Sequence, residues 1–423
     1  MAFADRYLAK QNSTFSLSPI EEWDAVELIV VIPSYNEPDL STTLKSLFTC
    51  NPTSRKVGVL VVVNDSEKSA PEVLEQNRKT LMEIELMEAE APQWIQLSHI
   101  YAQQLPHKHA GVGWARKIGM DLALTHFNQH DQSSGIIVSF DADSTVAPNY
   151  FQAIQQYFIE NPESIATTIY FEHPLTEDET SDAISWYELD MRYYKHALHY
   201  TGFSTPIYSV GSSLAVKASA YVAQGGMNRK KAGEDFYFLH KMLPYGTIGS
   251  LNTTTVFPSA RLSNRVPFGT GAALTKDNNG EIDLTLCFPL TAFNELRLCF
   301  AHIDQYYING AHLKVENLSA NLVFQTFCLN NSIVTQIGEL ANNCSSIEVF
   351  RKRFFHVFSA FIILKWLNYA QLNGYAKCSL LAQSYELAKL RGFAPKNVPE
   401  HPKLMLKLYR DVDKLPEMTR FAT

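Results

Sequence analysis

The chain has 423 residues, 46% of them hydrophobic, and this length is too great for one ordinary hydrophobic core. Its 36 basic and 43 acidic residues give a formal net charge of -7, so the basic excess typical of a nucleic-acid-binding protein is missing. The six cysteines show no paired C-x-x-C spacing, which argues against structural zinc and against a disulfide framework. We therefore expect two domains, or one large α/β domain with a helical extension, and reduced thiols.

We expect neither an export signal nor a membrane span in this sequence. Polar and charged residues interrupt residues 1–15, where a signal peptide would need an apolar core. The most apolar window, residues 354–372, contains His356 and Lys365 and is typical of a buried helix. We therefore predict a cytoplasmic protein. Peripheral contact with a membrane, through this aromatic helix or a basic surface, is a further possibility.

Apolar runs alternate with helical spacing through the first half of the chain, which predicts an α/β sheet. A strand followed by a helix, repeated three times, indicates right-handed crossovers in a doubly wound, mostly parallel sheet. A long aromatic helix is expected at residues 177–199. The predicted strands cover residues 26–33, 57–63, 95–101, 136–140, 164–171 and 207–217.

The strand at residues 136–140 leads directly into Asp141 and Asp143, at the sheet edge where open α/β sheets bind their ligands. If the extended conformation continues, side chains two residues apart project to the same side. The two carboxylates could then share one divalent cation, because such cations prefer oxygen ligands. By itself an Asp-x-Asp sequence is also typical of a helix cap or an Asx turn.

A turn with two glycines, Gly111 and Gly113, precedes the next predicted helix. A dinucleotide-binding fingerprint has a third glycine and lies directly after the first strand, and this turn meets neither condition. We expect instead a turn beside a phosphate, with Lys108 and Arg116 as positive charges and backbone amides of the helix start facing the anion. A solvated helix start with a packing glycine is the alternative.

Several motifs follow one another in a fixed order between residues 26 and 243. They are VIPSYNEP, VNDSE, the glycine-arginine turn, FDADS, GSSLAVK, GGM and GEDF. In this order they resemble the motifs of family 2 glycosyltransferases, which have the Rossmann-like GT-A fold. The resemblance implies an enzyme that transfers a sugar from a nucleotide-diphospho-sugar to an acceptor hydroxyl.

The resemblance also implies roles for individual residues. Four of them would contact the donor nucleoside: Pro33, Tyr35, Glu37 and Asp65. Asp141 and Asp143 would hold a Mg or Mn ion on the donor diphosphate, where the ion offsets the charge of the leaving group. Asp235 would be the general base, with Glu234 beside it, since an acceptor hydroxyl must lose its proton during attack. The displacement would then proceed with inversion, and retention is the alternative, because the same fold supports both outcomes.

The sequence departs from the family pattern in two places. Asn64 stands where many relatives carry a carboxylate, so only Asp65 keeps its implied role. The Gln-x-x-Arg-Trp sequence of processive relatives is replaced by PSARLSNRVPFGTGAAL at residues 258–274. We hypothesise that Arg261 and Arg265 of this loop contact the diphosphate or an anionic acceptor, because a guanidinium binds phosphate bidentately and the glycines would let a lid move. Solvated surface arginines are the alternative.

No catalytic motif appears after residue 283, and the apolar spacing there predicts helices at residues 313–327, 349–372 and 380–390. A helical C-terminal domain could cover the acceptor side or mediate assembly. The predicted organisation is an N-terminal extension, 1–25, a GT-A domain, 26–282, and a helical domain, 283–423.

These features predict a metal-dependent glycosyltransferase that uses a UDP-sugar and a carbohydrate or lipid-linked acceptor, in surface polysaccharide or glycoconjugate synthesis. A sugar-phosphate nucleotidyltransferase would share the sheet but should carry a glycine- and lysine/arginine-rich loop after the first strand, where this chain has SYNEP. A non-catalytic sugar-nucleotide-binding scaffold is the third possibility, against which the intact carboxylates argue.

Overall fold

The computed structural model describes residues 2–11, 20, 23–24, 26–108, 110–175, 180–230, 233–263 and 269–415. The chain divides into two compact units. The first, which we call the sheet unit, consists mainly of residues 1–184 and 209–281. The second, the helical unit, consists mainly of residues 185–208 and 282–412.

The sheet unit contains an eight-stranded sheet of order β3-β2-β1-β4-β7-β6-β8-β5. Strands β5 and β7 run antiparallel to their neighbours, and the other pairs are parallel. The mostly parallel α/β sheet predicted from the sequence is therefore confirmed. The strands are β1 (Leu28–Ser34), β2 (Val57–Ser66), β3 (Ile95–Leu105), β4 (Ile136–Ser139), β5 (Thr145–Val146), β6 (Ser164–Phe171), β7 (Leu214–Lys217) and β8 (Thr247–Phe257).

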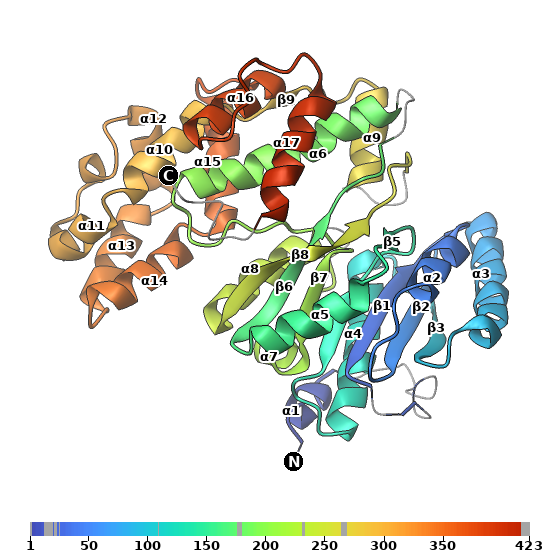
Figure 1. Ribbon diagram of the computed structural model, residues 1–423. Helices are drawn as coiled ribbons and strands as arrows, with labels where there is room; N and C mark the ends of the chain where they lie inside the picture. Colours follow the sequence, from blue (N-terminus) through green and yellow to red (C-terminus); the bar gives the residue numbers. More distant parts are fainter. Residues whose placement is uncertain are drawn as a thin grey trace. The chain divides into compact units, whose positions relative to one another are not determined.

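Helices connect these strands in the doubly wound manner (Figure 1). Helices α2 and α3 lead from β1 to β2 to β3, and α4 returns the chain past β1 to β4. Right-handed crossovers then place α4 on the opposite face from α2 and α3. The helices of this unit are α1 (Asp5–Leu8), α2 (Leu40–Phe48), α3 (Pro71–Glu90), α4 (Val112–Gln129), α5 (Tyr150–Glu160), α7 (Ala218–Ala223), α8 (Glu234–Met242) and α9 (Thr270–Asn278).

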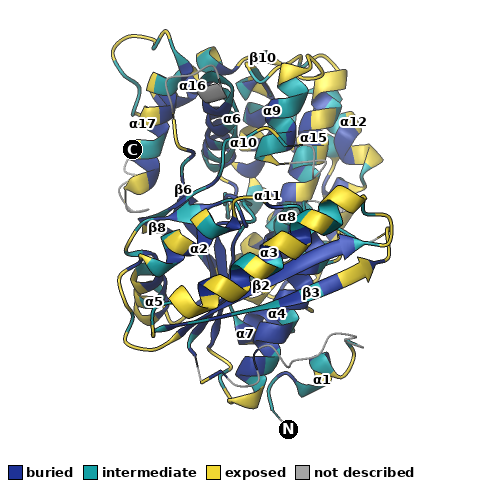
Figure 2. Ribbon diagram, turned by 90° about the vertical axis from the view of Figure 1, so that its right-hand side faces the viewer, coloured by how far each residue is buried: buried dark blue, intermediate teal, exposed yellow. Residues whose placement is uncertain are grey.

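The central strands form the core of the sheet unit. Strand β1 is buried along its whole length, as expected for a strand covered on both faces. Figure 2 shows β2 in the colour of buried residues, whereas the outer side of α3 is exposed. Helix α4 approaches the sheet closely at Gly119, where a Cβ atom would lie 2.3 Å from Val31 Cγ1.

One predicted strand is much shorter in the structure. Strand β7 covers only Leu214–Lys217 of the expected 207–217. The chain before it leaves the extended ladder: Ser139 Oγ donates a hydrogen bond to the carbonyl of Gly211 at 2.6 Å. The small residues of this segment were predicted to allow another group to approach closely. Gly211 does so, because the Arg116 guanidinium lies against it, but it lies in an irregular segment and not in a strand.

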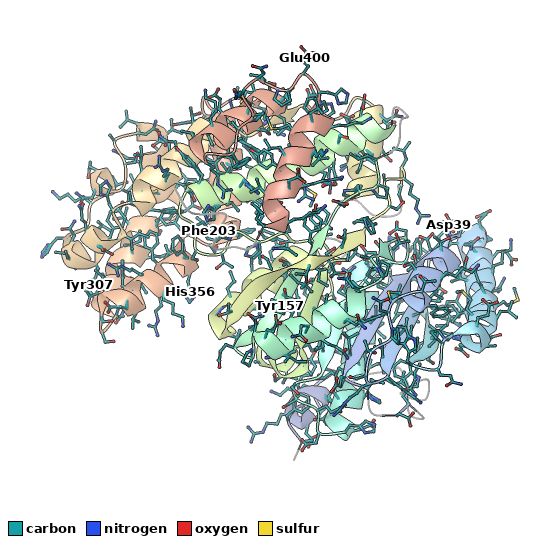
Figure 3. All side chains as sticks on the ribbon, in the orientation of Figure 1. Asp39, Tyr157, Phe203, Tyr307, His356 and Glu400 are labelled. Atoms are coloured by element: carbon teal, nitrogen blue, oxygen red, sulfur yellow. The ribbon has the colours of Figure 1, made fainter. Side chains whose placement is uncertain are left out.

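The helical unit contains most of α6 (Thr180–Tyr200) and a helical C-terminal region, which confirms that prediction. Its core is aromatic: buried Trp366 donates from Nε1 to the carbonyl of Ala292 at 3.0 Å. Phe203, labelled in Figure 3, is a further buried member, and the half-buried Tyr307 places its ring against Phe350. The elements are β9 (Leu286–Cys287), α10 (Leu290–Phe300), α11 (Ile303–Asn309), α12 (Leu322–Asn330), α13 (Ile333–Asn342), α14 (Ile347–Val357), α15 (Ala360–Leu372), β10 (Cys378–Ser379), α16 (Leu380–Leu390) and α17 (Pro402–Lys414).

Two helix predictions in this unit were wrong in detail. The helix expected at 313–327 begins only at α12, where the side chain of Asn321 accepts hydrogen bonds from the first-turn amides. The helix expected at 349–372 is broken into α14 and α15, because Ser359 caps a new helix start by accepting from the amide of Ile362. The searched helices of the described chain include none with the length and apolarity of a membrane span.

Candidate active site

The turn after β1 is held by a chain of amide side chains. The amide nitrogen of Asn36, at φ 49°, donates to Asn77 Oδ1 at 3.0 Å. Asn77 Nδ2 donates to the carbonyl of Asn64 at 2.9 Å, and Asn64 Nδ2 donates to the carbonyl of Ser34 at 2.9 Å. A carboxylate at position 64 could not donate this bond, which gives the departure from the family pattern a physical reason. The network positions Tyr35 beyond the carboxyl end of β1.

Asp65 follows Asn64 at the end of β2 and is buried. Its Oδ1 accepts a hydrogen bond from the amide of Gln104 at 2.7 Å, and Tyr101 also bonds its carboxylate. Burial and this bond raise the pKa of Tyr101 to about 12. Asp65 is thus fixed at the sheet edge, and its contact with a nucleoside stays a prediction, as does that of Pro33 in β1.

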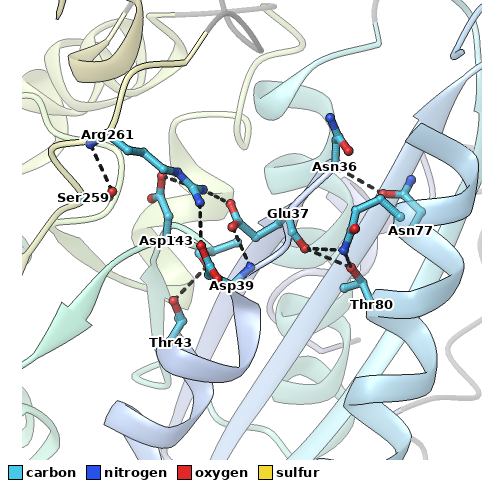
Figure 4. Close-up of polar contacts among 11 residues, drawn as sticks. Asn36, Glu37, Asp39, Thr43, Asn77, Thr80, Asp143, Ser259 and Arg261 are labelled. Atoms are coloured by element: carbon cyan, nitrogen blue, oxygen red, sulfur yellow. Dashed lines mark hydrogen bonds and ion pairs between the residues drawn. The ribbon is translucent and has the colours of Figure 1, made fainter. Parts of the chain in front are cut away.

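Arg261 gathers three carboxylates around its guanidinium (Figure 4). It pairs with Glu37, which is buried, and with Asp39 and Asp143 at 3.3 and 3.2 Å. Glu37 is further fixed because its Oε1 accepts from the amide of Asp39 at 3.0 Å. The structure therefore brings Arg261 to the predicted donor residues, whereas Arg265 lies outside the described residues.

Arg116 lies inside the protein, 1% exposed, and this corrects the expectation that it faces a phosphate. It pairs with Glu234 through Nη1 and with Asp141 Oδ1 at 2.5 Å through Nη2. Two glycines make room for this group: a Cβ on Gly211 would lie 2.8 Å from Arg116 Nη2, and one on Gly113 would lie 3.0 Å from Glu234 Cβ. Arg116 thus joins the Asp-x-Asp segment to the acid pair of α8.

Lys108, the other cation predicted near a phosphate, is exposed in the turn before α4. The structure places it at the protein surface, so its predicted role in donor binding remains a hypothesis.

The Asp-x-Asp segment is a turn, so the extended arrangement expected from the sequence is wrong. The amide of Ser144 donates to the carbonyl of Asp141 at 3.3 Å, and Thr43 Oγ1 of α2 donates to the carbonyl of Ala142 at 2.9 Å. The chain turns here because the next strand, β5, runs antiparallel to β8. As a result Asp141 pairs with Arg116 and Asp143 with a different arginine.

The two aspartates fit a divalent ion that is shared with a diphosphate. Their side chains are 37% and 28% exposed, so carboxylate oxygens face solvent. In the searched part of the chain no three His, Cys, Asp or Glu side chains gather into a metal cage. Mg ions are commonly bound by one or two carboxylates together with phosphate oxygens rather than by the protein alone. Asp141 and Asp143 suit that arrangement.

The acid pair begins helix α8. Glu234 is buried against Arg116, and its carbonyl accepts from Asn228 Nδ2 at 3.0 Å. Burial, reinforced by the charge of Glu234, raises the pKa of Asp235 to about 7, although Arg116 opposes this shift. A carboxyl group with such a pKa can accept a proton near neutral pH, as a general base requires.

Sequence reasoning missed Asn77 and Thr43. Both are buried polar residues on amphipathic helices, α3 and α2. Each uses its side chain to fix a backbone segment of the site, as described above. A polar residue among the buried positions of a helix indicates that its side chain has a hydrogen-bond partner. Sequence spacing does not show which residue that partner is.

Comparison with known proteins supplies the family. Residues 29–221 match the model described as glycosyl transferase family 2. No curated protein sequence matches the chain significantly. Among solved structures, S. aureus TarS 1-349 in complex with UDP-GlcNAc is 11% identical with a TM-score of 0.40, covering 78% of this chain and 91% of that one. Mannosyltransferase PcManGT from Pyrobaculum calidifontis, in complex with GDP-Man and Mn2+, is 14% identical with a TM-score of 0.40, covering 97% and 91%.

The mostly parallel sheet with carboxylates at its edge is that of a glycosyltransferase of the GT-A type, followed by a helical region. Residues 29–221, slightly less than half of the chain, thus resemble glycosyl transferase family 2, a family of enzymes.

Proposed function

We propose that the enzyme transfers a sugar, with inversion, from a nucleotide-diphospho-sugar to an acceptor hydroxyl, and that a UDP-sugar is the donor. One observation carries the proposal. A single buried arginine, Arg116, holds Asp141 of the donor segment and Glu234 of the acid pair, so the metal-binding and proton-accepting groups belong to one site. This arrangement suits a reaction in which a diphosphate leaves while a hydroxyl attacks.

The residues act in a division of labour. Asp235 takes the proton of the acceptor hydroxyl, for which its raised pKa prepares it. Arg116 pairs with Glu234 and so fixes the position of the acid pair. Asp141 and Asp143 would hold a Mn or Mg ion, which when bound stabilises negative charge on the leaving diphosphate. Arg261 lies beside Asp143, where it can contact the same diphosphate.

The finer assignments are part of the same proposal. The donor nucleoside would lie against Pro33, Tyr35, Glu37 and Asp65, with Lys108 near the phosphates. The acceptor would be a carbohydrate or lipid-linked sugar in surface polysaccharide or glycoconjugate synthesis. Six free cysteines support a cytoplasmic location, because thiols stay reduced there. We place the catalytic domain at 26–282 and the helical domain at 283–423.

The first test is thermal stability against UDP-, GDP- and dTDP-sugars, each with and without Mn or Mg. A donor at about a hundred times its Kd should stabilise the enzyme by roughly 2.7 kcal/mol. The shift should need the metal and should be lost in Asp143→Ala. No shift with any nucleotide would contradict the donor site, whereas a metal-dependent shift without any turnover would favour the non-catalytic scaffold.

The second test separates binding from chemistry. Asp235→Asn should keep the metal-dependent shift, yet its turnover should fall by roughly two to four powers of ten, because general-base assistance is lost. Full turnover in Asp235→Asn would show that another group is the base. Product anomers analysed by NMR report inversion directly.

A further inference from the structure

Two cysteines of the helical unit face each other across a short antiparallel ladder. Cys287 of β9 is paired directly with Cys378 of β10. Opposite residues in antiparallel strands have Cα atoms about 4.5 to 5.5 Å apart. A disulfide needs Cα atoms about 4.4 to 6.8 Å apart, so the backbone already has the required separation.

Contacts on both sides hold the ladder in place. The amide of Leu380 donates to the carbonyl of Thr285 at 2.8 Å, one step further along. The amide of Leu290, at the start of α10, donates to Gln383 Oε1 of α16 at 2.7 Å. Figure 1 shows β9 beside α16, into which β10 leads. The two cysteines are therefore presented to each other by a fixed backbone.

The two thiols differ in access to solvent. Cys287 is 2% exposed, whereas Cys378 is only partly buried, and the thiols are within hydrogen-bonding reach of each other. Burial raises the pKa of both thiols. Oxidation should therefore begin at Cys378, proceed slowly at neutral pH and accelerate as pH rises, because the thiolate is the reacting form.

We propose that Cys287 and Cys378 form a reversible disulfide when the protein meets a peroxide. Cys378 attacks an oxygen of hydrogen peroxide, which breaks the O–O bond and gives a sulfenic acid and water. Cys287 then attacks that sulfur, the S–S bond forms and a second water leaves, so two thiols lose two electrons to one peroxide. A dithiol reductant reverses the reaction.

The bridge would close a loop of about 90 residues that contains α10 to α15. Such a loop restricts the unfolded chain strongly, so the oxidised protein should melt at a higher temperature than the reduced one. The modification is independent of glycosyl transfer, since neither cysteine belongs to the proposed active site.

The test treats the purified full chain with hydrogen peroxide, blocks remaining thiols with N-ethylmaleimide under denaturing conditions, and measures intact mass. The protein should lose two of its six thiols, and a non-reducing peptide map should link Cys287 to Cys378. Dithiothreitol should restore both. Cys378→Ser and Cys287→Ser should each abolish the bridge, whereas Cys344→Ser, at another buried cysteine of the same unit, should retain it.

Three outcomes would overturn the proposal. They are an unchanged thiol count, a link between other cysteines, or further oxidation of Cys378 while Cys287 still reacts with maleimide in the wild-type chain. The wild-type peptide map decides among them without relying on any variant to fold. A bridge that lowers the melting temperature would refute the inferred fit of the ladder to a disulfide.

Discussion

At the scale of single residues, the ionisation of Asp235 links stability to pH. Its pKa is raised to about 7 in the folded protein from an ordinary value of 3.8. Between these values the folded state binds more protons than the unfolded state, so stability contributed by this group falls as pH rises. Asp235→Asn cannot ionise and should unfold at higher urea concentration than wild type at pH 8, by roughly 1 to 4 kcal/mol, with little difference near pH 4.

The same ionisation should appear in catalysis. Because a general base must be unprotonated, kcat/KM should rise with pH and level off above about 7, following Asp235 in the free enzyme. A stability difference that is equal at pH 4 and pH 8, or a pH-independent kcat/KM, would show that Asp235 does not titrate in this range.

Arg116 provides a second prediction for a single residue. Arg116→Leu leaves Glu234 buried without its cation, so the free energy of unfolding should fall by roughly 3 to 5 kcal/mol. Arg55→Leu is the matched control, since its pair with Glu27 is exposed by 61% and 39% and should cost at most about 1 kcal/mol. Urea titration of both variants measures the contrast, and equal losses would contradict the buried role.

Residue types were easier to predict than residue partners. The sequence order predicts the carboxylates at the sheet edge, and the structure brings Glu37, Asp141, Asp143 and Glu234 to two arginines. The burial of Arg116 could not be foreseen, because its partners lie 25 and 118 residues away. Local spacing carries no information about such pairs.

At the scale of elements, the break between α14 and α15 depends on a cap. Ser359 accepts a hydrogen bond from the amide of Ile362 at the start of α15. Ser359→Ala should therefore lower the free energy of unfolding by about 1 kcal/mol. Ser345→Ala, at an exposed residue of the same unit, should change it by less than about 0.5 kcal/mol. Similar losses in chemical denaturation would argue against the cap.

Element predictions succeeded where burial is continuous and failed at ends. Strands β1, β2 and β6 have long buried runs that a period-two or fully apolar pattern detects. The apolar spacing of 349–372 continues across Ser359, so periodicity alone joined two helices that a side-chain cap separates. The turn at Asp141 likewise depends on the pairing of β5 with distant β8.

At the scale of the whole molecule, the two units should respond differently to ligand. Each has its own buried core, so calorimetry should resolve two unfolding transitions. A donor nucleotide with Mn should raise only the transition of the sheet unit, where the proposed site lies. Asp143→Ala should remove this shift and leave the other transition unchanged. One transition that moves as a whole would show that the units unfold together.

The strand order also has a consequence for biosynthesis. Strands β1, β2 and β3 are neighbours and leave the ribosome first, but β4 gains its second neighbour only when β7 is made, and β7 lies between β4 and β6. Until residue 217 has emerged, β4 presents an open edge to other nascent chains, and such edges promote aggregation. Arg261, which pairs with both Glu37 and Asp143, is synthesised later still. Nascent chains of this enzyme should therefore need chaperones most while β1 to β4 have been synthesised and β7 has not.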